Sequence, residues 1–97
     1  MFLKYYISEF NYQLIEENYD RDFLSSLDED IFKENLNIFN KYKISCIEDI
    51  ILNYLDIFTF DSNILDSRIV RLITKLGNNY NEIINNNLSV INDLYNE

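Results

Sequence analysis

Apolar residues recur at helical spacing along this 97-residue chain, whereas strict alternation of apolar and polar residues is rare. The first apolar stripe consists of Leu3, Tyr6, Ile7, Phe10 and Leu14. Its spacing predicts one helix that runs to about Asn18, and a short helical turn is predicted from Asp22 to Ser26. The chain has no Pro and one Gly, so the usual markers of β-turns and hairpins are missing. The pattern therefore predicts an all-α fold.

A long helix and a short helix are predicted next. Asp28 stands before two further acids and has the features of an N-cap, which predicts a helix over residues 29–43. Ser45 and Glu48 have the spacing of a capping box, in which the two side chains satisfy free backbone N–H groups. This box predicts a short helix over residues 46–54.

The same order of signals returns later in the chain. Asp61 is the expected N-cap of a second long helix, and Gly77 stands at the position just after its last turn. Asn79 and Glu82 resemble a second capping box, which predicts another short helix. An apolar tail follows each short helix: Leu55, Ile57 and Phe58 in one case, and Val90, Ile91 and Leu94 in the other.

These parallels predict a structural repeat. Residues 28–58 align with residues 61–91 without a gap, and the identical pairs are Asp28/Asp61, Ile31/Ile64, Ile50/Ile83, Ile51/Ile84, Asn53/Asn86 and Leu55/Leu88. Stacked units can bury a shared core that one unit cannot bury alone. We therefore expect a single all-α domain over residues 1–97, a small helical bundle of two stacked helical-hairpin repeats. Its parts are an N-terminal cap (residues 1–26), a first unit (residues 28–58) and a second unit (residues 61–94).

One part of this pattern is similar to a known repeat. The positions concerned are Ile47, Ile50, Ile51, Ile57 and Phe58, then Leu65, Arg68, Ile69, Leu72, Leu76 and Gly77, and finally Ile83 and Ile84. Through them, residues 44–91 resemble the helical repeat of the mitochondrial transcription termination factor (mTERF) family, although the family's proline position holds Leu55 and Leu88. The resemblance implies stacked helix pairs and, as a function, binding of nucleic acid.

The charge of the chain is strongly negative and unevenly distributed. Seventeen acids against eight bases give a formal net charge of −9, and residues 1–34 hold nine of the acids but three of the bases. The densest acids form what we call the acidic segment: Glu16, Glu17, Asp20, Asp22, Asp28, Glu29, Asp30 and Glu34. Such a field repels nucleic acid and anionic membranes and favours a basic partner. The alternative interpretation is a solvated surface whose acids stabilise helix N-termini.

Candidate catalytic chemistry is sparse. With no His and the single Cys46, a nucleophile–base pair or a zinc site is not expected, and Cys46 is predicted to be an ordinary packed or neutral thiol. Carboxylate pairs at i, i+4, namely Glu16/Asp20 and Asp30/Glu34, can hold a cation, but the preferred interpretation is solvated acids. We therefore predict no catalytic residue, no cofactor and no metal.

Two further groups of residues are candidates for binding. Arg68, Arg71 and Lys75, at i, i+3 and i+7, form a basic stripe that can contact phosphates, as the mTERF resemblance suggests, or pair with a neighbouring acid such as Asp66. Five tyrosines fit the apolar stripes less well than the others: Tyr5, Tyr12, Tyr19, Tyr54 and Tyr95. Exposed Tyr beside acids is typical of protein interfaces, and the alternative is a place at the margin of the core.

These observations favour a non-enzymatic, small acidic binding or inhibitor protein. We expect it to block a basic, nucleic-acid-binding surface of a partner protein, as anti-CRISPR and other phage anti-defence proteins do, with helical acids imitating a row of phosphates. The alternatives are a toxin-immunity protein, an mTERF-like nucleic-acid binder that uses the basic stripe, and a structural helical module.

The setting follows from what the sequence lacks. A single Cys, no long apolar run and no signal-peptide pattern predict a cytoplasmic protein, of a bacterium or of a virus-infected host, without a membrane partner. Direct contact with nucleic acid is not expected from so acidic a chain. The pattern leaves both a monomer and a homodimer open.

Overall fold

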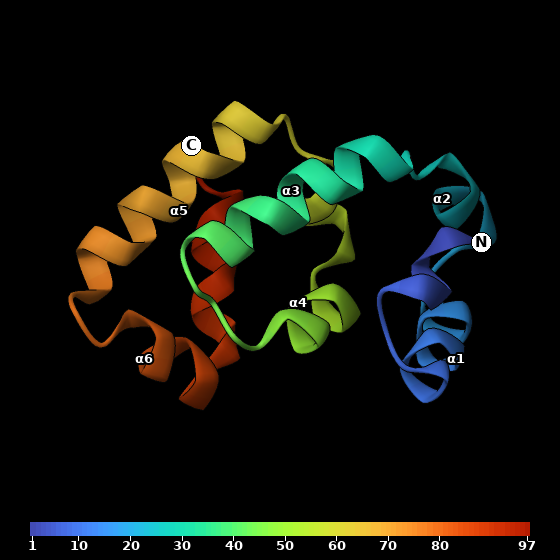
Figure 1. Ribbon diagram of the computed structural model, residues 1–97, viewed down its shortest axis with the longest axis horizontal. Helices are drawn as coiled ribbons and strands as arrows, with labels where there is room; N and C mark the ends of the chain where they lie inside the picture. Colours follow the sequence, from blue (N-terminus) through green and yellow to red (C-terminus); the bar gives the residue numbers. More distant parts are fainter.

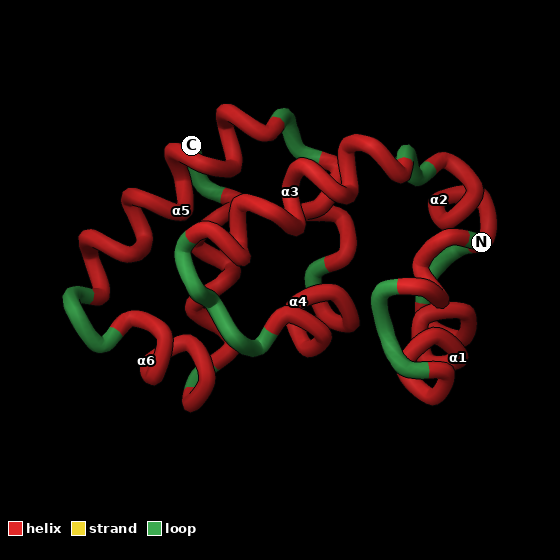
Figure 2. Tube along the Cα trace, in the orientation of Figure 1, coloured by secondary structure: helices red, strands yellow, loops and turns green.

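The computed structural model describes residues 1–97, which form helices joined by short turns (Figure 1). Helices cover 77% of the chain and there is no strand, which confirms the predicted all-α fold (Figure 2). The α-helices are α1 (Glu9–Asn18), α2 (Arg21–Ser26), α3 (Glu29–Lys41), α4 (Ile47–Asn53), α5 (Ser62–Leu76) and α6 (Tyr80–Asn86). The 3-10 helices are η1 (Phe2–Tyr5), η2 (Leu55–Thr59) and η3 (Leu88–Tyr95).

The N-terminal segment differs from its prediction. Instead of one continuous helix, η1 is followed by a break and then by α1. Ser8 explains the break, because its backbone is extended (φ −65°, ψ 157°) and its hydroxyl accepts a hydrogen bond from the N–H of Asn11 at 3.2 Å. This is an N-cap, and it starts a new helix in the middle of the apolar stripe. Phe10, expected in the core, is consequently 70% exposed.

The caps of the long helices are as predicted. Asp28 accepts hydrogen bonds from two backbone N–H groups in the first turn of α3, at 2.8 and 3.2 Å. Asp61 does the same at α5, at 2.9 and 3.3 Å. Gly77 follows α5 with φ 85°, a left-handed conformation that a residue with a Cβ adopts only with strain.

The two predicted capping boxes are wrong. Cys46 and Asn79 occupy the N-cap positions of α4 and α6, and neither side chain caps its helix. Ser45 lies one residue before the N-cap, where its N–H and hydroxyl reach asparagine side chains of α6 at 3.0 Å instead. Glu48 accepts a hydrogen bond from the side chain of Asn11 at 2.6 Å. Contacts between elements have thus replaced the local caps.

The two units contain the same elements in the same order. Equivalent first residues, 33 positions apart, are Glu29 and Ser62, Ile47 and Tyr80, and Leu55 and Leu88. The backbone hydrogen bond that closes α4, from Tyr54 to Ile50 at 2.8 Å, recurs at the end of α6 from Asn87 to Ile83 at 2.9 Å. Each unit is therefore a long helix, a short helix and a 3-10 tail.

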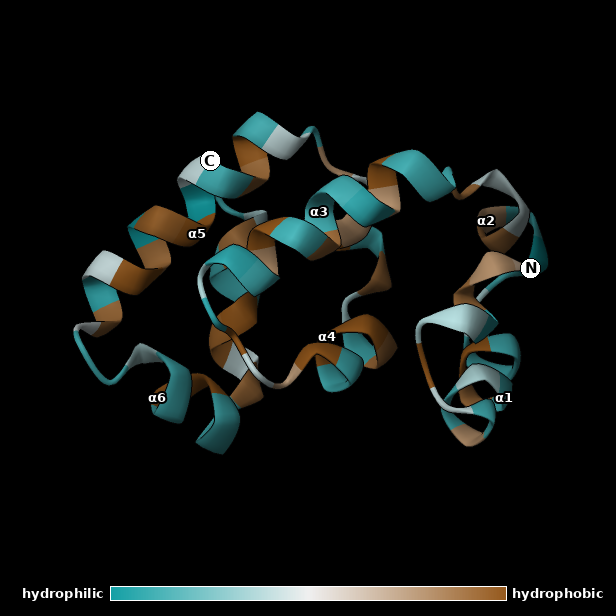
Figure 3. Cartoon of the chain, in the orientation of Figure 1, coloured by the Kyte–Doolittle hydropathy of each residue, from teal (hydrophilic) through white to brown (hydrophobic).

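One hydrophobic core joins the N-terminal cap to both units. It contains 19 buried apolar residues, and Figure 3 shows the apolar stripes of α3, α4 and α5 beside polar faces. The ring of Phe58 lies at its centre, with ring centroids 5.0 Å from Phe32 and 5.3 Å from Phe39. Helix α3 packs against α5 and η2, α1 packs against α4, and η3 packs against α5 and α6. This packing fixes the N-terminal cap against the first unit.

Candidate partner-binding surface

The acidic segment occupies the N-terminal cap and the start of α3. It places Glu16 and Glu17 in α1, Asp20 and Asp22 at the start of α2, Asp28, Glu29 and Asp30 at the start of α3, and Glu34 one turn further on. All eight residues are exposed. Because α1, α2 and the first turns of α3 lie together at one end of the molecule (Figure 1), the charges gather at that end.

Three acids of this segment also have a structural role. Asp20 accepts a hydrogen bond from the N–H of Asp22 at 3.3 Å and so caps α2, as Asp28 caps α3. Glu29 accepts a hydrogen bond from the hydroxyl of Tyr6 at 3.2 Å, which links η1 to α3. The carboxylates without any hydrogen bond are those of Glu16, Glu17, Asp22, Asp30 and Glu34. Helix capping and hydrogen bonding therefore account for three of the eight acids of the segment.

All ion pairs of the protein lie outside the acidic segment. Lys41 pairs with Asp66 at 2.9 Å, and Asp93 lies 3.8 Å from Arg71 and 3.4 Å from Lys75. No carboxylate of the acidic segment has a cationic nitrogen within 4.0 Å. Exposed charges that lack a close counter-charge project their field into solvent over roughly a Debye length, about 8–10 Å at physiological salt.

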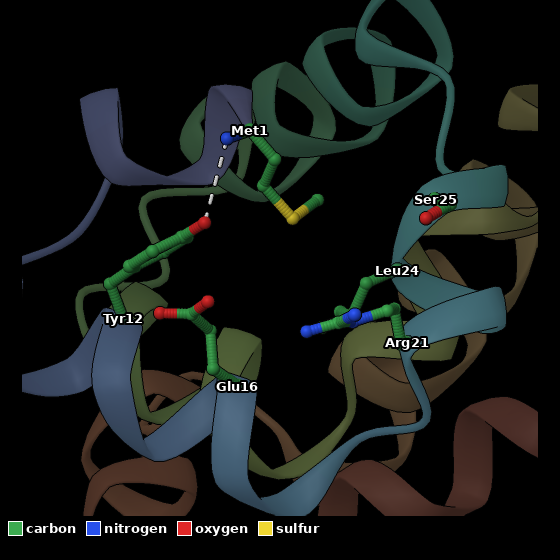
Figure 4. A pocket seen from close by; sticks show the side chains of 6 residues that line it. All are labelled: Met1, Tyr12, Glu16, Arg21, Leu24 and Ser25. Carbon is green, nitrogen blue, oxygen red and sulfur yellow. Dashed lines mark hydrogen bonds between the residues drawn. The ribbon is translucent and has the colours of Figure 1, made fainter.

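A hollow of about 270 Å³ opens on this end of the protein (Figure 4). Glu16 of α1 and Arg21 of α2 line it from facing sides, and Leu24 lies beside Arg21. The amino group of Met1 donates a hydrogen bond to the Tyr12 hydroxyl at 3.5 Å along its rim. The hollow combines one carboxylate and one guanidinium, so its charges oppose each other.

The basic stripe holds the C-terminal segment in place. Arg68 donates a hydrogen bond to the carbonyl of Leu94 at 3.0 Å. Arg71 donates to backbone oxygens of Asp93, Asn96 and Glu97 at 3.1, 2.8 and 2.9 Å, and Lys75 reaches the Asp93 carboxylate. The basic stripe therefore pairs with an acid, as one of its two interpretations predicts, but that acid is Asp93 and not Asp66.

The predicted partner of the stripe, Asp66, has other contacts. It accepts hydrogen bonds from the hydroxyl of Tyr42 and from the ammonium group of Lys41, both on the first unit. The Tyr42 hydroxyl first, and then Lys41, hold the pKa of this carboxyl below its ordinary value. Asp66 therefore joins the two units and is not available to the basic stripe.

Cys46 is half-buried at the start of α4. Burial raises the pKa of its thiol, because the thiolate loses solvation there, and the coulombic effect of Asp49 acts in the same direction. A thiol with a raised pKa is a weak nucleophile at neutral pH. No group of three or more Cys, Asp and Glu side chains comes together in a way that could hold a metal ion.

The sequence did not predict the roles of two residues, Asn35 and Asp56. Asn35 is fully buried, and its place three residues after Phe32 and four before Phe39 puts it on the apolar face of α3. Asp56 accepts a hydrogen bond from the hydroxyl of Tyr95 at 2.6 Å. The misfit of Tyr95 with the apolar stripes was the one available signal for this second contact.

The fold and this surface define a class: a small all-α protein of two stacked helical units with a strongly acidic end. No family model, curated protein or solved structure matches the chain. None of its helices combines the length and the apolar character that crossing a bilayer requires.

Proposed function

We propose that this protein is a non-enzymatic binding protein whose acidic segment docks on a basic surface of a partner protein and blocks it. The observation that supports this proposal best is the set of eight exposed carboxylates without an ion pair, all at one end of the molecule. Capping and hydrogen bonding account for Asp20, Asp28 and Glu29, and first-turn positions account for Asp22 and Asp30, but Glu16, Glu17 and Glu34 have neither role.

Exposed aromatic residues near the acids support the same proposal. Tyr5 is 78% exposed and Phe10 is 70% exposed, and both belong to the N-terminal cap. Aromatic side chains provide large contact area at interfaces, while surrounding charges steer the partner and fix its orientation. Aromatic rings and carboxylates at one end are the groups with which a basic protein surface can interact.

The mechanism of blocking is electrostatic steering followed by steric occlusion. Carboxylates on α1, α2 and α3 place negative charges at helical intervals. A protein surface that binds the phosphates of nucleic acid attracts such charges as well. Association is then fast and sensitive to salt. Anti-defence inhibitors and toxin-immunity proteins are two classes of protein that would use such a blocking activity.

The test compares two matched triple variants. Asp22→Asn/Asp30→Asn/Glu34→Gln removes three acids of the acidic segment that neither cap a helix nor form a hydrogen bond. Asp49→Asn/Glu82→Gln/Glu97→Gln removes three exposed acids elsewhere. Both variants change the net charge equally, and both keep the hydrogen bonds that hold the fold.

The wild type and the control triple should capture the same partner from the native host, and the acidic-segment triple should lose it. With the purified partner, we expect the acidic-segment triple to associate about tenfold or more slowly at low salt, and the difference to shrink in about 0.5 M salt. Equal slowing by both triples would mean that net charge alone acts, and the proposed docking surface would be wrong.

Nucleic-acid binding through the basic stripe is tested separately. Arg71 is a poor choice for substitution, because it holds the C-terminal segment through three backbone oxygens. Lys75 has one long contact to Asp93 at 3.4 Å and binds no backbone oxygen, so Lys75→Glu keeps the hydrogen bonds of Arg68 and Arg71 to the C-terminal segment. Tight, salt-dependent binding of DNA or RNA that Lys75→Glu weakens would replace the acidic-docking proposal.

A further inference from the structure

An open groove of about 500 Å³ lies on the surface where the N-terminal cap meets the two units. One wall consists of Asn18, Tyr19, Asp20 and Phe23, at the junction of α1 and α2. The other wall consists of Asn53 at the end of α4, Asp56 in η2 and Tyr95 at the end of η3. Residues far apart in the sequence thus line one open depression.

The first wall is fixed to the body of the protein. The hydroxyl of Tyr19 donates a hydrogen bond to the carbonyl of Leu52 at 3.0 Å and accepts one from the N–H of Leu55 at 3.3 Å. The ring of Tyr19 stacks on that of Phe23, with centroids 5.8 Å apart and an angle of 27° between the planes. The groove is therefore formed in the free protein, so a ligand would not have to order this wall.

The second wall is fixed through Asp56. Its Oδ1 accepts a hydrogen bond from the hydroxyl of Tyr95 at 2.6 Å. Burial, first, and then this hydrogen bond raise the pKa of Tyr95, so the phenol stays protonated and keeps donating at physiological pH. Tyr95 also contacts Tyr54 and Phe60, with ring centroids 6.2 and 6.1 Å away.

The charge and shape of the groove select its ligand. Asp20 and Asp56 bring a carboxylate from each wall, Asn18 and Asn53 add side-chain amides, and no cationic residue lines the groove. Carboxylates, amide oxygens and aromatic faces are the groups that a guanidinium binds, because it has several N–H donors in one plane and a flat cationic face. We propose that this groove binds an arginine side chain of the basic partner.

The protein contains a related arrangement next to the groove. The guanidinium carbon of Arg68 lies 5.5 Å from the ring centroid of Phe60, and the ring of Phe60 in turn packs edge-on against Tyr95. Arg68 is held there by its hydrogen bond to the Leu94 carbonyl and does not line the groove. The ring of Phe60 thus contacts one guanidinium of the protein itself, while Asp56, on the groove side of Tyr95, has no cationic partner.

This inference rests on the proposed function and adds to it an anchoring site for one residue of the partner. An arginine fits better than a lysine, since an ammonium group is a compact point charge that neither stacks on a ring nor pairs with a carboxylate through two parallel bonds. Long-range attraction by the acidic segment and close binding in the groove are separable steps.

The experiment titrates the ¹⁵N-labelled protein with acetyl-Gly-Arg-Gly-amide and follows backbone amide shifts. The controls are the same peptide with citrulline, which has nearly the same shape but no charge, and with lysine. We expect saturable shifts concentrated at residues 18–23, 53–56 and 95 with the arginine peptide, and binding weaker by about fivefold or more with either control.

Two single variants decide whether the groove itself binds. Asp56→Asn removes the charge but keeps an oxygen that accepts from Tyr95, so the fold should persist. Asp49→Asn removes one exposed charge from the preceding helix, outside the groove. We expect Asp56→Asn to weaken arginine-peptide binding by about fivefold or more and Asp49→Asn by less than about twofold.

The outcomes separate this inference from the proposed function. Equal effects of Asp56→Asn and Asp49→Asn, or equal binding of the arginine and citrulline peptides, would overturn the arginine site, while the triple-variant result for the acidic segment could still hold. Equal binding of the lysine peptide would overturn the preference for a guanidinium. Failure of the triple-variant test with the peptide results intact would overturn the docking proposal and leave the groove as an arginine site.

Discussion

Asn35 and Arg68 stand 33 residues apart on α3 and α5, and each side chain donates to the backbone at or just after the 3-10 tail of its own unit. The amide of Asn35 donates to the carbonyls of Phe58 and Phe60 at 2.8 and 2.9 Å. Arg68 donates to the carbonyl of Leu94 at 3.0 Å. Two chemically different residues therefore fasten the 3-10 tail of a unit to its long helix. The neutral amide suits the fully buried position, because an ion there would lose its solvation.

Asn35→Leu should destabilise the protein. The carbonyls of Phe58 and Phe60 would lose their donor inside the core, although the substitution also removes the Asn35 oxygen that has no hydrogen-bond partner. We expect a net loss of about 1–3 kcal/mol in the free energy of unfolding, measured by urea denaturation.

The control for this prediction is Asn37→Leu, on the exposed face of the same helix. Its effect should stay within about 0.5 kcal/mol, because no buried group changes its partner. If both substitutions had the same effect, helix propensity rather than the buried amide would determine the stability of this position.

Arg71→Ala should loosen the C-terminal segment. The guanidinium donates to three backbone oxygens between Asp93 and Glu97, so its loss leaves them to water. We expect about 1–2 kcal/mol less stability and faster hydrogen exchange at the amides of η3. Lys75→Ala is the matched control and should change the exchange of η3 little. Unchanged protection in Arg71→Ala would show that Arg68 and the apolar side chains of η3 hold this segment without Arg71.

Substitutions at Asp28 should separate its capping role from its charge. Asp28→Ala removes the acceptor for two N–H groups of α3 and should cost about 1 kcal/mol of stability, whereas Asp28→Asn keeps an equivalent cap. Thermal unfolding gives the stabilities, and association with the partner gives the effect of charge. A slower association of Asp28→Asn at unchanged stability is the expected result. A large loss of stability in Asp28→Asn would contradict the separation.

The pH dependence of stability should reflect Asp66. The Tyr42 hydroxyl and then Lys41 lower its pKa in the folded protein below the ordinary 3.8, so protonation of Asp66 favours unfolding. Its stabilising effect is therefore present above the pKa of the unfolded chain and is lost as pH falls through the lower pKa of the folded protein.

The measurement is the stability of the wild type and of Asp66→Asn from pH 6 downward. The wild type should be the more stable at pH 6, and the difference should shrink below about pH 4. Tyr42→Phe removes the first cause of the shift, so in that variant the pKa of Asp66, followed by carboxyl NMR, should lie closer to its ordinary value. A pKa of Asp66 that Tyr42→Phe leaves unchanged would contradict this cause.

Local signals predicted the helices well where the sequence alone satisfies the backbone. Asp28 and Asp61 cap the long helices, and Gly77 follows α5 with the conformation that glycine favours. The prediction failed where a partner distant in sequence competes for the same group. Ser45 binds asparagines of α6 instead of capping α4, because the two units bring that helix within hydrogen-bond distance.

The candidate site was predictable in its charge but not in its shape. The exposure of the acidic segment follows from its composition, whereas the groove requires α1, η2 and η3 to meet. Ser8 is a residue type that favours N-caps, but the apolar stripe continues across it and predicts one unbroken helix. Helical spacing places Asn35, but not Asn37, on the apolar face of α3, whereas the carbonyls that bind its amide lie more than 20 residues away and could not be predicted from the local sequence.

The junction between the units has a consequence for how this chain could evolve. Phe60 leads into Asp61 as Leu27 leads into Asp28, and both apolar residues pack on the core while both acids start a long helix. A tandem duplication of one 33-residue stretch would therefore insert at matching joints. The body could lengthen by whole units after the first one, while the N-terminal cap keeps its contacts with α3 and α4.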